Sequence, residues 1–229
     1  MILNIETTDR ICSVALSDQR GVQAVRESAE GYNHSSLLTV FIEELLKENG
    51  LQAADLEAVA VSMGPGSYTG LRIGVSTAKG LCYGASVPLV AVPTLDAMVC
   101  GFLEKHAGGL PPSACLVPMI DARRMEVYTA LYDATGNRQQ EVQALVVDED
   151  SFLQQPADVR LDFFGTGAMK CASVIRHPGA VFHDDIRPSA AFMAPLSARA
   201  VRQKRFADVA YFEPYYLKDF RATTPKKLF

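Results

Sequence analysis

The sequence predicts an α/β fold made of two related subdomains, each with a mixed sheet and flanking helices. Two observations carry this prediction. In the first half, three strand-like segments are followed by a helix, a strand, a helix and a strand. The second half repeats the same succession in a degraded form. Because 229 residues suffice for one large domain or two small ones, we place the subdomains at residues 1–97 and 98–229, with the C-terminal tail free to pack back on the first.

The chain opens with short runs rich in β-branched and aliphatic residues, at residues 2–7, 11–16 and 21–28. Polar residues separate them at 8–10 and 18–20. Short apolar runs interrupted by turn residues are typical of neighbouring antiparallel strands. We therefore expect a three-stranded antiparallel meander.

A helix is expected next, beginning after the candidate N-cap Asn33 and ending near residue 49. Apolar residues follow the three-four spacing of an amphipathic helix. They are Leu37, Leu38, Phe41, Leu45 and Leu46.

A glycine-rich turn lies between a predicted strand at 56–62 and a predicted helix at 71–84, with a further strand at 87–92. Three glycines and a proline here mark a turn where the backbone must come close to another group. A P-loop is excluded, because Leu71 and Arg72 stand where its lysine belongs. The spacing of the glycines at 64, 66 and 70 is one residue too long for a dinucleotide fingerprint, whose acidic residue would be Asp96. That interpretation remains a weak alternative.

In the second half, the sequence pattern predicts the elements only in outline. We expect a helix at 95–105, a hairpin of strands at 115–121 and 127–133, and a helix at 189–204 interrupted at Pro195. Between them, strands are predicted at 143–147 and 158–164, with a second glycine turn at 165–168. A meander followed by helix, strand, helix and strand is the order found in one half of the actin-like, Hsp70-like and sugar-kinase ATPase (ASKHA) fold, which duplicates that half.

The composition of the chain argues against several classes of function. The net charge of −4 argues against nonspecific nucleic-acid binding by the whole surface, although the tail from Lys218 onward is basic. No apolar run is long enough to span a membrane and the N-terminus lacks a signal-peptide pattern. Five cysteines without metal or redox spacing suggest reduced thiols in a cytoplasmic protein.

No catalytic or metal-binding constellation is evident from the sequence. The four histidines, His34, His106, His177 and His183, do not form an H-x-x-x-H or H-E-x-x-H pair. Ser67 is not in a nucleophile elbow. We therefore expect no catalytic residue and no metal site.

Small residues recur every fourth position in the helix after the glycine turn, at Gly70, Gly74, Ala78 and Cys82. They share one face of that helix. Since glycine within a helix costs about 0.5–1 kcal/mol, this row must allow another element to approach closely. Spacing alone slightly favours packing against the protein's own sheet. The other interpretation is an outward docking surface, and we adopt it for the partner prediction below.

At this point the sequence resembles the tRNA threonylcarbamoyladenosine biosynthesis proteins of the TsaB (YeaZ) family. The resemblance is dense over the first hundred residues, and the glycine-turn string is its specific part. The matching pieces are Leu3-Asn4-Ile5-Glu6-Thr7-Thr8, Cys12-Ser13-Val14-Ala15-Leu16, His34, Gly64 to Gly74, Thr77-Ala78-Lys79-Gly80-Leu81, Asp121-Ala122-Arg123-Arg124, Glu126-Val127-Tyr128 and Tyr215-Tyr216-Leu217.

One departure bears on nucleotide binding. Glu6 stands where family members often carry the aspartate that related ATPases place near the nucleotide's metal. The first hairpin also lacks the glycine of a D-x-G-[ST] loop, so it is poorly shaped to approach a phosphate chain.

The resemblance implies a non-catalytic scaffold subunit, with no cofactor of its own. It would pair with a TsaD-like catalytic subunit that transfers a threonylcarbamoyl group to an adenosine beside the tRNA anticodon. A TsaE-like ATPase would join them, tRNA would be contacted through the complex, and the lone chain would form a homodimer. Whether ATP or ADP is shared at the complex interface is left open.

Helices 34–48 and 70–83 are the expected partner face. The residues assigned to it are His34, Leu38, Phe41, Leu45, Gly70, Gly74, Ala78 and Cys82. The alternative function is an ATP-dependent small-molecule kinase of the same fold.

Overall fold

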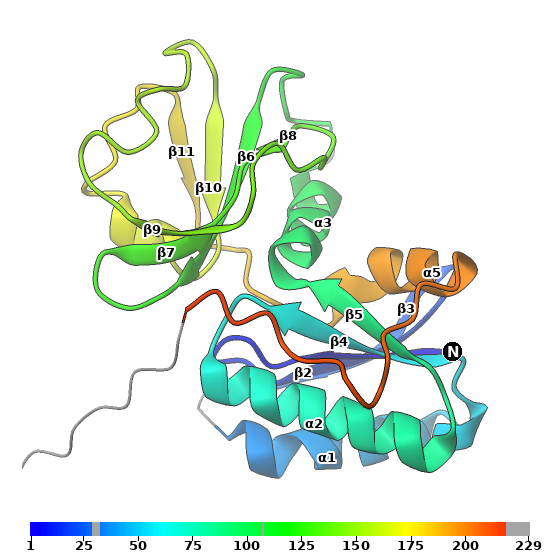
Figure 1. The fold of residues 1–229 in the computed structure, drawn as a ribbon. Coiled ribbons are helices and arrows are strands. Elements are labelled where there is room, and N and C mark those ends of the chain that lie inside the picture. The colour runs from blue at the N-terminus through cyan, green and yellow to red at the C-terminus, as the bar shows by residue number, and fades with distance from the viewer. Residues whose placement is uncertain (29–32, 107, 219–229) are drawn as a thin grey trace, which may run out of the picture.

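The computed structural model describes residues 1–28, 33–106 and 108–218, arranged in two lobes (Figure 1). The basic tail singled out in the sequence therefore lies, beyond Lys218, outside the described residues. None of the helices in these ranges is long and apolar enough to cross a membrane.

The first lobe is built on a five-stranded sheet in the order β3-β2-β1-β4-β5. Its strands are β1 (Ile2–Glu6), β2 (Ser13–Asp18), β3 (Gly21–Glu27), β4 (Ala58–Gly64) and β5 (Leu89–Pro93). β1, β2 and β3 pair antiparallel, whereas β1–β4 and β4–β5 pair parallel. The predicted meander is confirmed, and the sheet is mixed as expected.

Helices cover both faces of this sheet. α1 (His34–Glu48) and α2 (Tyr68–Ala85) lie side by side on one face, and α5 (Ala194–Arg202) packs on the other (Figure 1). Successive strand residues point to opposite faces, and in β4 alanine and valine alternate accordingly. Large residues such as Leu3 and Val59 meet α1 and α2, while alanines such as Ala58 meet α5. A short helical turn, η1 (Ala53–Asp55), precedes β4.

The second lobe carries a six-stranded mixed sheet, ordered β11-β10-β6-β7-β9 with β8 on β6. α3 (Thr94–His106) leads into it from β5. β6, β10 and β11 run parallel, while β7 pairs antiparallel with β6 and with β9. Its elements are β6 (Cys115–Asp121), β7 (Glu126–Thr129), β8 (Tyr132–Asp133), β9 (Gln143–Val146), β10 (Leu161–Phe164), α4 (Ala168–Cys171) and β11 (Ala180–His183).

The chain then returns to the first lobe. Residues 189–204 were expected as one interrupted helix of the second subdomain, but they form a short 3-10 turn, η2 (Ala191–Met193), followed by α5 against β1, β2 and β5. Pro195 does not break α5, because it occupies the first turn, where its missing N–H has no helical partner. Beyond α5, the N–H of Ala207 donates to Leu89 O at 2.8 Å, and the chain runs along α2 (Figure 1).

The small-residue row of α2 faces inward, so the expectation that it forms an outward docking surface is wrong. Gly70, Gly74, Ala78 and Cys82 are all buried. A Cβ on Gly70 would overlap the carbonyl oxygen of Thr7, and one on Gly74 would overlap its hydroxyl. Thr7 Oγ1 donates to Gly70 O at 2.7 Å. The close approach is therefore made by the end of β1, as the alternative interpretation held.

Because the row is buried against Thr7, a larger residue at Gly70 should destabilise the fold. Gly70→Ala should lower the free energy of unfolding by about 1–3 kcal/mol, because the added methyl meets backbone atoms that cannot rotate away. Gly80 lies in the same helix with open space around its Cβ position, so Gly80→Ala should raise stability by about 0.5–1 kcal/mol. Urea unfolding of both variants measures the contrast. Equal stability of the two variants would contradict the inward orientation.

Candidate functional site

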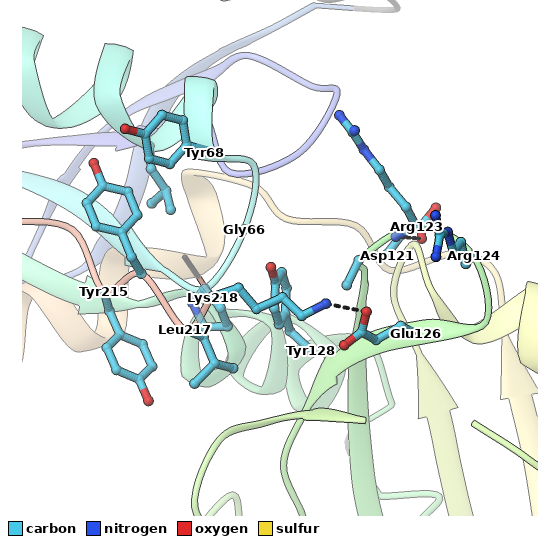
Figure 2. A pocket seen from close by; sticks show the side chains of 14 residues that line it. Gly66, Tyr68, Asp121, Arg123, Arg124, Glu126, Tyr128, Tyr215, Leu217 and Lys218 are labelled. Atoms are coloured by element: carbon cyan, nitrogen blue, oxygen red, sulfur yellow. Dashed lines mark hydrogen bonds and ion pairs between the residues drawn. The ribbon is translucent and has the colours of Figure 1, made fainter. Parts of the chain in front are cut away.

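A cleft of about 800 Å³ opens between the lobes, where three segments meet. Figure 2 shows the β4–α2 turn and the C-terminal segment on one side and the β6–β7 hairpin on the other. The lining residues are Pro65, Gly66, Tyr68, Leu71, Asp121, Ala122, Arg123, Arg124, Glu126, Tyr128, Tyr215, Tyr216, Leu217 and Lys218. Several motifs of the sequence thus line one cavity.

The glycine turn of this cleft is packed on both sides by the protein's own backbone. On one side, a Cβ on Gly66 would lie 2.6 Å from Thr8 O, which also accepts the N–H of Ser67 at 2.7 Å. On the other side, Tyr215 N–H donates to Met63 O at 2.7 Å. Gly64 has a φ of 109°, and a Cβ there would lie 2.8 Å from Tyr215 O. These glycines therefore admit segments of the chain itself.

Two arginines form the tip of the β6–β7 hairpin on the opposite wall. Arg123 and Arg124 have φ values of 71° and 50°. This left-handed backbone conformation is costly for residues other than glycine. Lys170 holds this tip: its ammonium contacts Asp121 and donates to Arg124 O at 2.8 Å and Glu126 O at 2.7 Å. The hairpin therefore exposes the side chains of Arg123 and Arg124, and Lys170 holds its backbone in place.

Aromatic rings cover the first-lobe side of the cleft. The rings of Tyr68 and Tyr216 lie 5.1 Å apart, and the guanidinium of Arg72 sits 5.6 Å from the centre of the Tyr68 ring. Lys218 forms an ion pair with Glu126 across the cleft (Figure 2). The C-terminal segment therefore joins the two walls.

Glu6 lies buried behind the cleft, at the end of β1. Only 1% of it is exposed, and its Oε1 accepts the N–H and the hydroxyl of Thr8, each at 2.5 Å. Burial raises the pKa of Glu6 to about 7. Burial likewise raises the pKa of Asp9 in the adjacent turn, and the charge of Asp121 adds to this effect.

This arrangement does not fit a nucleotide phosphate chain at the glycine turn. Phosphate cradles need free backbone N–H groups facing the ligand, whereas the N–H of Ser67 is bound to Thr8 and that of Gly64 to Thr94 Oγ1 at 3.1 Å. Asp96, the acidic residue of the dinucleotide alternative, accepts the hydroxyl of Tyr132 at 2.6 Å.

Most residues assigned to the partner face lie in the core. His34, Leu38 and Leu45 are buried, like the α2 row, and Phe41 is half-buried. The side of α2 that faces solvent carries a different four-residue row. The members of this outer α2 row are Arg72, Ser76, Gly80 and Gly84, and Tyr83, which is 85% exposed, lies next to it.

Sequence reasoning missed the outer α2 row, although it repeats small residues at the same interval. It lies two positions from the inner row, and two residues turn a helix by about 200°, so the rows occupy opposite sides. Beside it, α1 exposes Val40, Glu43, Glu44 and Lys47.

Two mixed sheets, each with helices, in the order found here define the ASKHA class of two-lobed α/β protein. A solved structure described as YeaZ from Pseudomonas aeruginosa is similar, with a TM-score of 0.79 and 24% identity over 94% of this chain and 99% of that one. The family model described as TsaD, tRNA N6-adenosine threonylcarbamoyltransferase, matches residues 25–175.

Curated relatives make the assignment specific. The tRNA threonylcarbamoyladenosine biosynthesis protein TsaB of Escherichia coli is 31% identical over 95% of this chain and 94% of its own length. TsaB of Haemophilus influenzae is 28% identical over 99% and 96%. The chain belongs to the TsaB (YeaZ) family, as the sequence resemblance indicated.

Glu6 predicts a measurable pH dependence of stability. Its folded pKa of about 7 exceeds the ordinary value of 4.5, so the folded state holds the proton more tightly than the unfolded state. The stability from this group is complete below about pH 4.5 and is lost as the pH rises through 7, by about 1.4 kcal/mol per pH unit. Glu6→Gln should remove this slope and be more stable than the wild type at pH 8 by about 3 kcal/mol.

Urea unfolding between about pH 5 and 8 tests this, with Glu141→Gln as the control because Glu141 is exposed. Parallel pH profiles for the wild type and Glu6→Gln would contradict the assignment.

Proposed function

We propose that this chain is a non-catalytic subunit that pairs with a TsaD-like transferase in the complex that adds threonylcarbamoyl to adenosine next to the tRNA anticodon. The carrying observation is the glycine turn, in which the position of a phosphate cradle is taken by Thr8 on one side and Tyr215 on the other. When the chain's own backbone occupies the phosphate-binding position of the turn, the fold is kept but phosphate binding at that turn is lost. Membership of the TsaB family supports the choice of pathway.

The surface proposed for pairing is the exposed side of α1 and α2, in place of the buried residues first assigned to it. Gly80 and Gly84 have no atom near their Cβ positions, so a helix can come close to the α2 backbone there. Tyr83 offers a large exposed ring beside them, and an exposed aromatic residue is a common anchor in interfaces.

The proposed occupant is the matching helix pair of a protein with the same fold. The match of residues 25–175 to the TsaD model supports a partner of related architecture. Two related helix pairs can meet about a pseudo-two-fold axis, and a second copy of this chain can take the same place when the partner is absent. We therefore retain the homodimer as the proposed state of the lone chain.

The TsaE-like ATPase and tRNA complete the proposed assembly. tRNA would be reached through the complex, since this chain is acidic overall. A nucleotide in the assembly would be held mainly by the partner subunits, because the glycine turn of this chain does not fit its phosphates.

The pairing proposal predicts that a bulky residue in the outer α2 row blocks assembly without unfolding the chain. Gly80→Leu should retain the wild-type melting temperature to within a few degrees and lower affinity for the TsaD-like subunit at least tenfold, because the leucine fills the space needed by the partner helix. Co-elution and calorimetry measure binding, and thermal unfolding measures the fold. The control is Leu153→Arg, an exposed position of the second lobe.

Undiminished binding by Gly80→Leu would contradict this face as the interface. The function itself is tested separately, by deleting the gene and measuring threonylcarbamoyladenosine in bulk tRNA. Loss of the modified nucleoside, restored by the wild-type gene and not by Gly80→Leu, is the expected result.

The small-molecule kinase alternative makes the opposite prediction for the isolated chain. A kinase should bind ATP with magnesium at micromolar concentration without a partner, whereas the scaffold proposal expects no heat of binding under those conditions. Titration calorimetry on the purified chain separates the two, with NAD(P) as a further arm for the dinucleotide alternative. Micromolar ATP binding would favour the kinase.

A further inference from the structure

Two histidines far apart in sequence meet in the second lobe. His106 ends α3, His183 ends β11, and Asp185 follows two residues later. One donor atom from each lies within 4.8 Å of the other two. The rings of His106 and His183 are 4.8 Å apart and inclined by 64°. The two residues are 77 positions apart, so the local spacing that argued against a metal site does not address this cluster.

The ring of His183 is held by a buried carboxylate. Its Nε2 lies 2.7 Å from Oδ1 of Asp162, which is fully buried. Arg160 fixes that carboxylate by donating Nε to Oδ2 at 2.9 Å and Nη2 to Oδ1 at 2.7 Å. The contact engages Nε2 of His183, so a metal would have to bind its Nδ1. A histidine bound in this way to a carboxylate is the usual support of a metal-ligating imidazole.

His106 carries a nitrogen without a hydrogen-bond partner. Its ring stacks on Phe102 with centres 4.4 Å apart. Its Nε2 is buried and makes no hydrogen bond to any described residue. The nearest carboxylate oxygen, Oδ2 of Asp185, is 3.6 Å away, too far for such a bond. A buried nitrogen left in this way is costly and calls for an explanation.

We propose that His106, His183 and Asp185 bind one divalent transition-metal ion of the zinc class. Two imidazoles and a carboxylate suit Zn²⁺ and its neighbours rather than Mg²⁺ or Ca²⁺, which prefer oxygen ligands. Bond lengths of roughly 2.0–2.1 Å in a tetrahedral site place donor atoms roughly 3.3 Å apart. The donor atoms now lie within 4.8 Å of one another, so metal binding requires a contraction of the cluster. Water would fill the fourth position.

Lys105 competes for the same carboxylate. Its ammonium lies 3.7 Å from Asp185 Oδ2 and donates to the carbonyl oxygen of Asp185 at 2.6 Å. The shorter contact involves the backbone, so it can persist when a metal takes the carboxylate.

The ion would join the two connections between the lobes. α3 carries the chain from the first sheet to the second, and residues 184–190 carry it back towards α5. His106 belongs to the first connection and Asp185 to the second. A bound metal would therefore hold the two connections together and limit changes in the angle between the lobes.

Titration calorimetry of the untagged full chain, stripped with a chelator and kept reduced, tests the site with Zn²⁺ alone. We expect one ion per chain with micromolar or tighter affinity, and a melting temperature about 5 °C or more higher at saturating Zn²⁺. His106→Gln and Asp185→Asn should each weaken binding at least tenfold and abolish the thermal shift. The matched control is Asp184→Asn, at the exposed neighbouring acid, which should bind as the wild type does.

Co²⁺ spectroscopy distinguishes this site from binding by the five free cysteines. Nitrogen and oxygen ligands give d–d bands without a thiolate charge-transfer band, which is the expected spectrum. A thiolate band, no binding by the folded wild type, or unchanged binding by Asp185→Asn would each overturn the proposal. Asp185→Asn alters an exposed side chain, so it keeps the test decisive even where His106→Gln fails to fold.

Discussion

The contact between Thr7 and the inner face of α2 is the constraint on which the first lobe depends. Gly70 and Gly74 lack the atoms that would hold the helix away, and the threonine hydroxyl binds a helical carbonyl in the space they leave. This brings the helix onto the end of β1 and sets the path of the turn that precedes it. Thr8, the next residue, then packs on Gly66. The position of the interlobe cleft follows from these neighbouring contacts.

Because of the same contacts, this chain has the two-lobed architecture, but its glycine turn is not open to a phosphate chain. A glycine turn between a strand and a helix can receive a phosphate only if its amides point into open space. In this chain, two of those amides bind Thr8 and Thr94, and Glu6 is buried beneath Thr8 instead of facing the cleft. The opposite wall of the cleft is charged at the hairpin tip, where Lys170 donates to the backbone that carries Arg123 and Arg124. The fold thus keeps its two lobes, while the groups around the turn serve packing.

Much of this could be predicted from the sequence, because strong local patterns determine it. The meander, α1 and the glycine turn were placed within a few residues, since each has a clear periodicity or turn residues. β11 was missed: it has four half-buried residues, too few for a pattern. The return of α5 to the first sheet was also missed, because local periodicity says that a helix is amphipathic and not which sheet it meets.

At the candidate sites, the sequence did not predict which side of a helix is buried. α2 contains two small-residue rows on opposite sides, and nothing within the helix says which one is buried. The choice is made by Thr7, more than sixty positions away. The meeting of His106 and His183 is equally nonlocal, since it depends on how α3 and the second sheet pack.

The pairing of Ala207 with Leu89 has a consequence for how this molecule can associate. β5 is one of the two edge strands of its sheet, and an uncovered edge strand can pair with a foreign chain that extends the sheet. The returning segment occupies part of that edge with its own backbone. Addition of a foreign strand is thereby obstructed on this border, which leaves β3 as the more accessible edge for extension of the sheet.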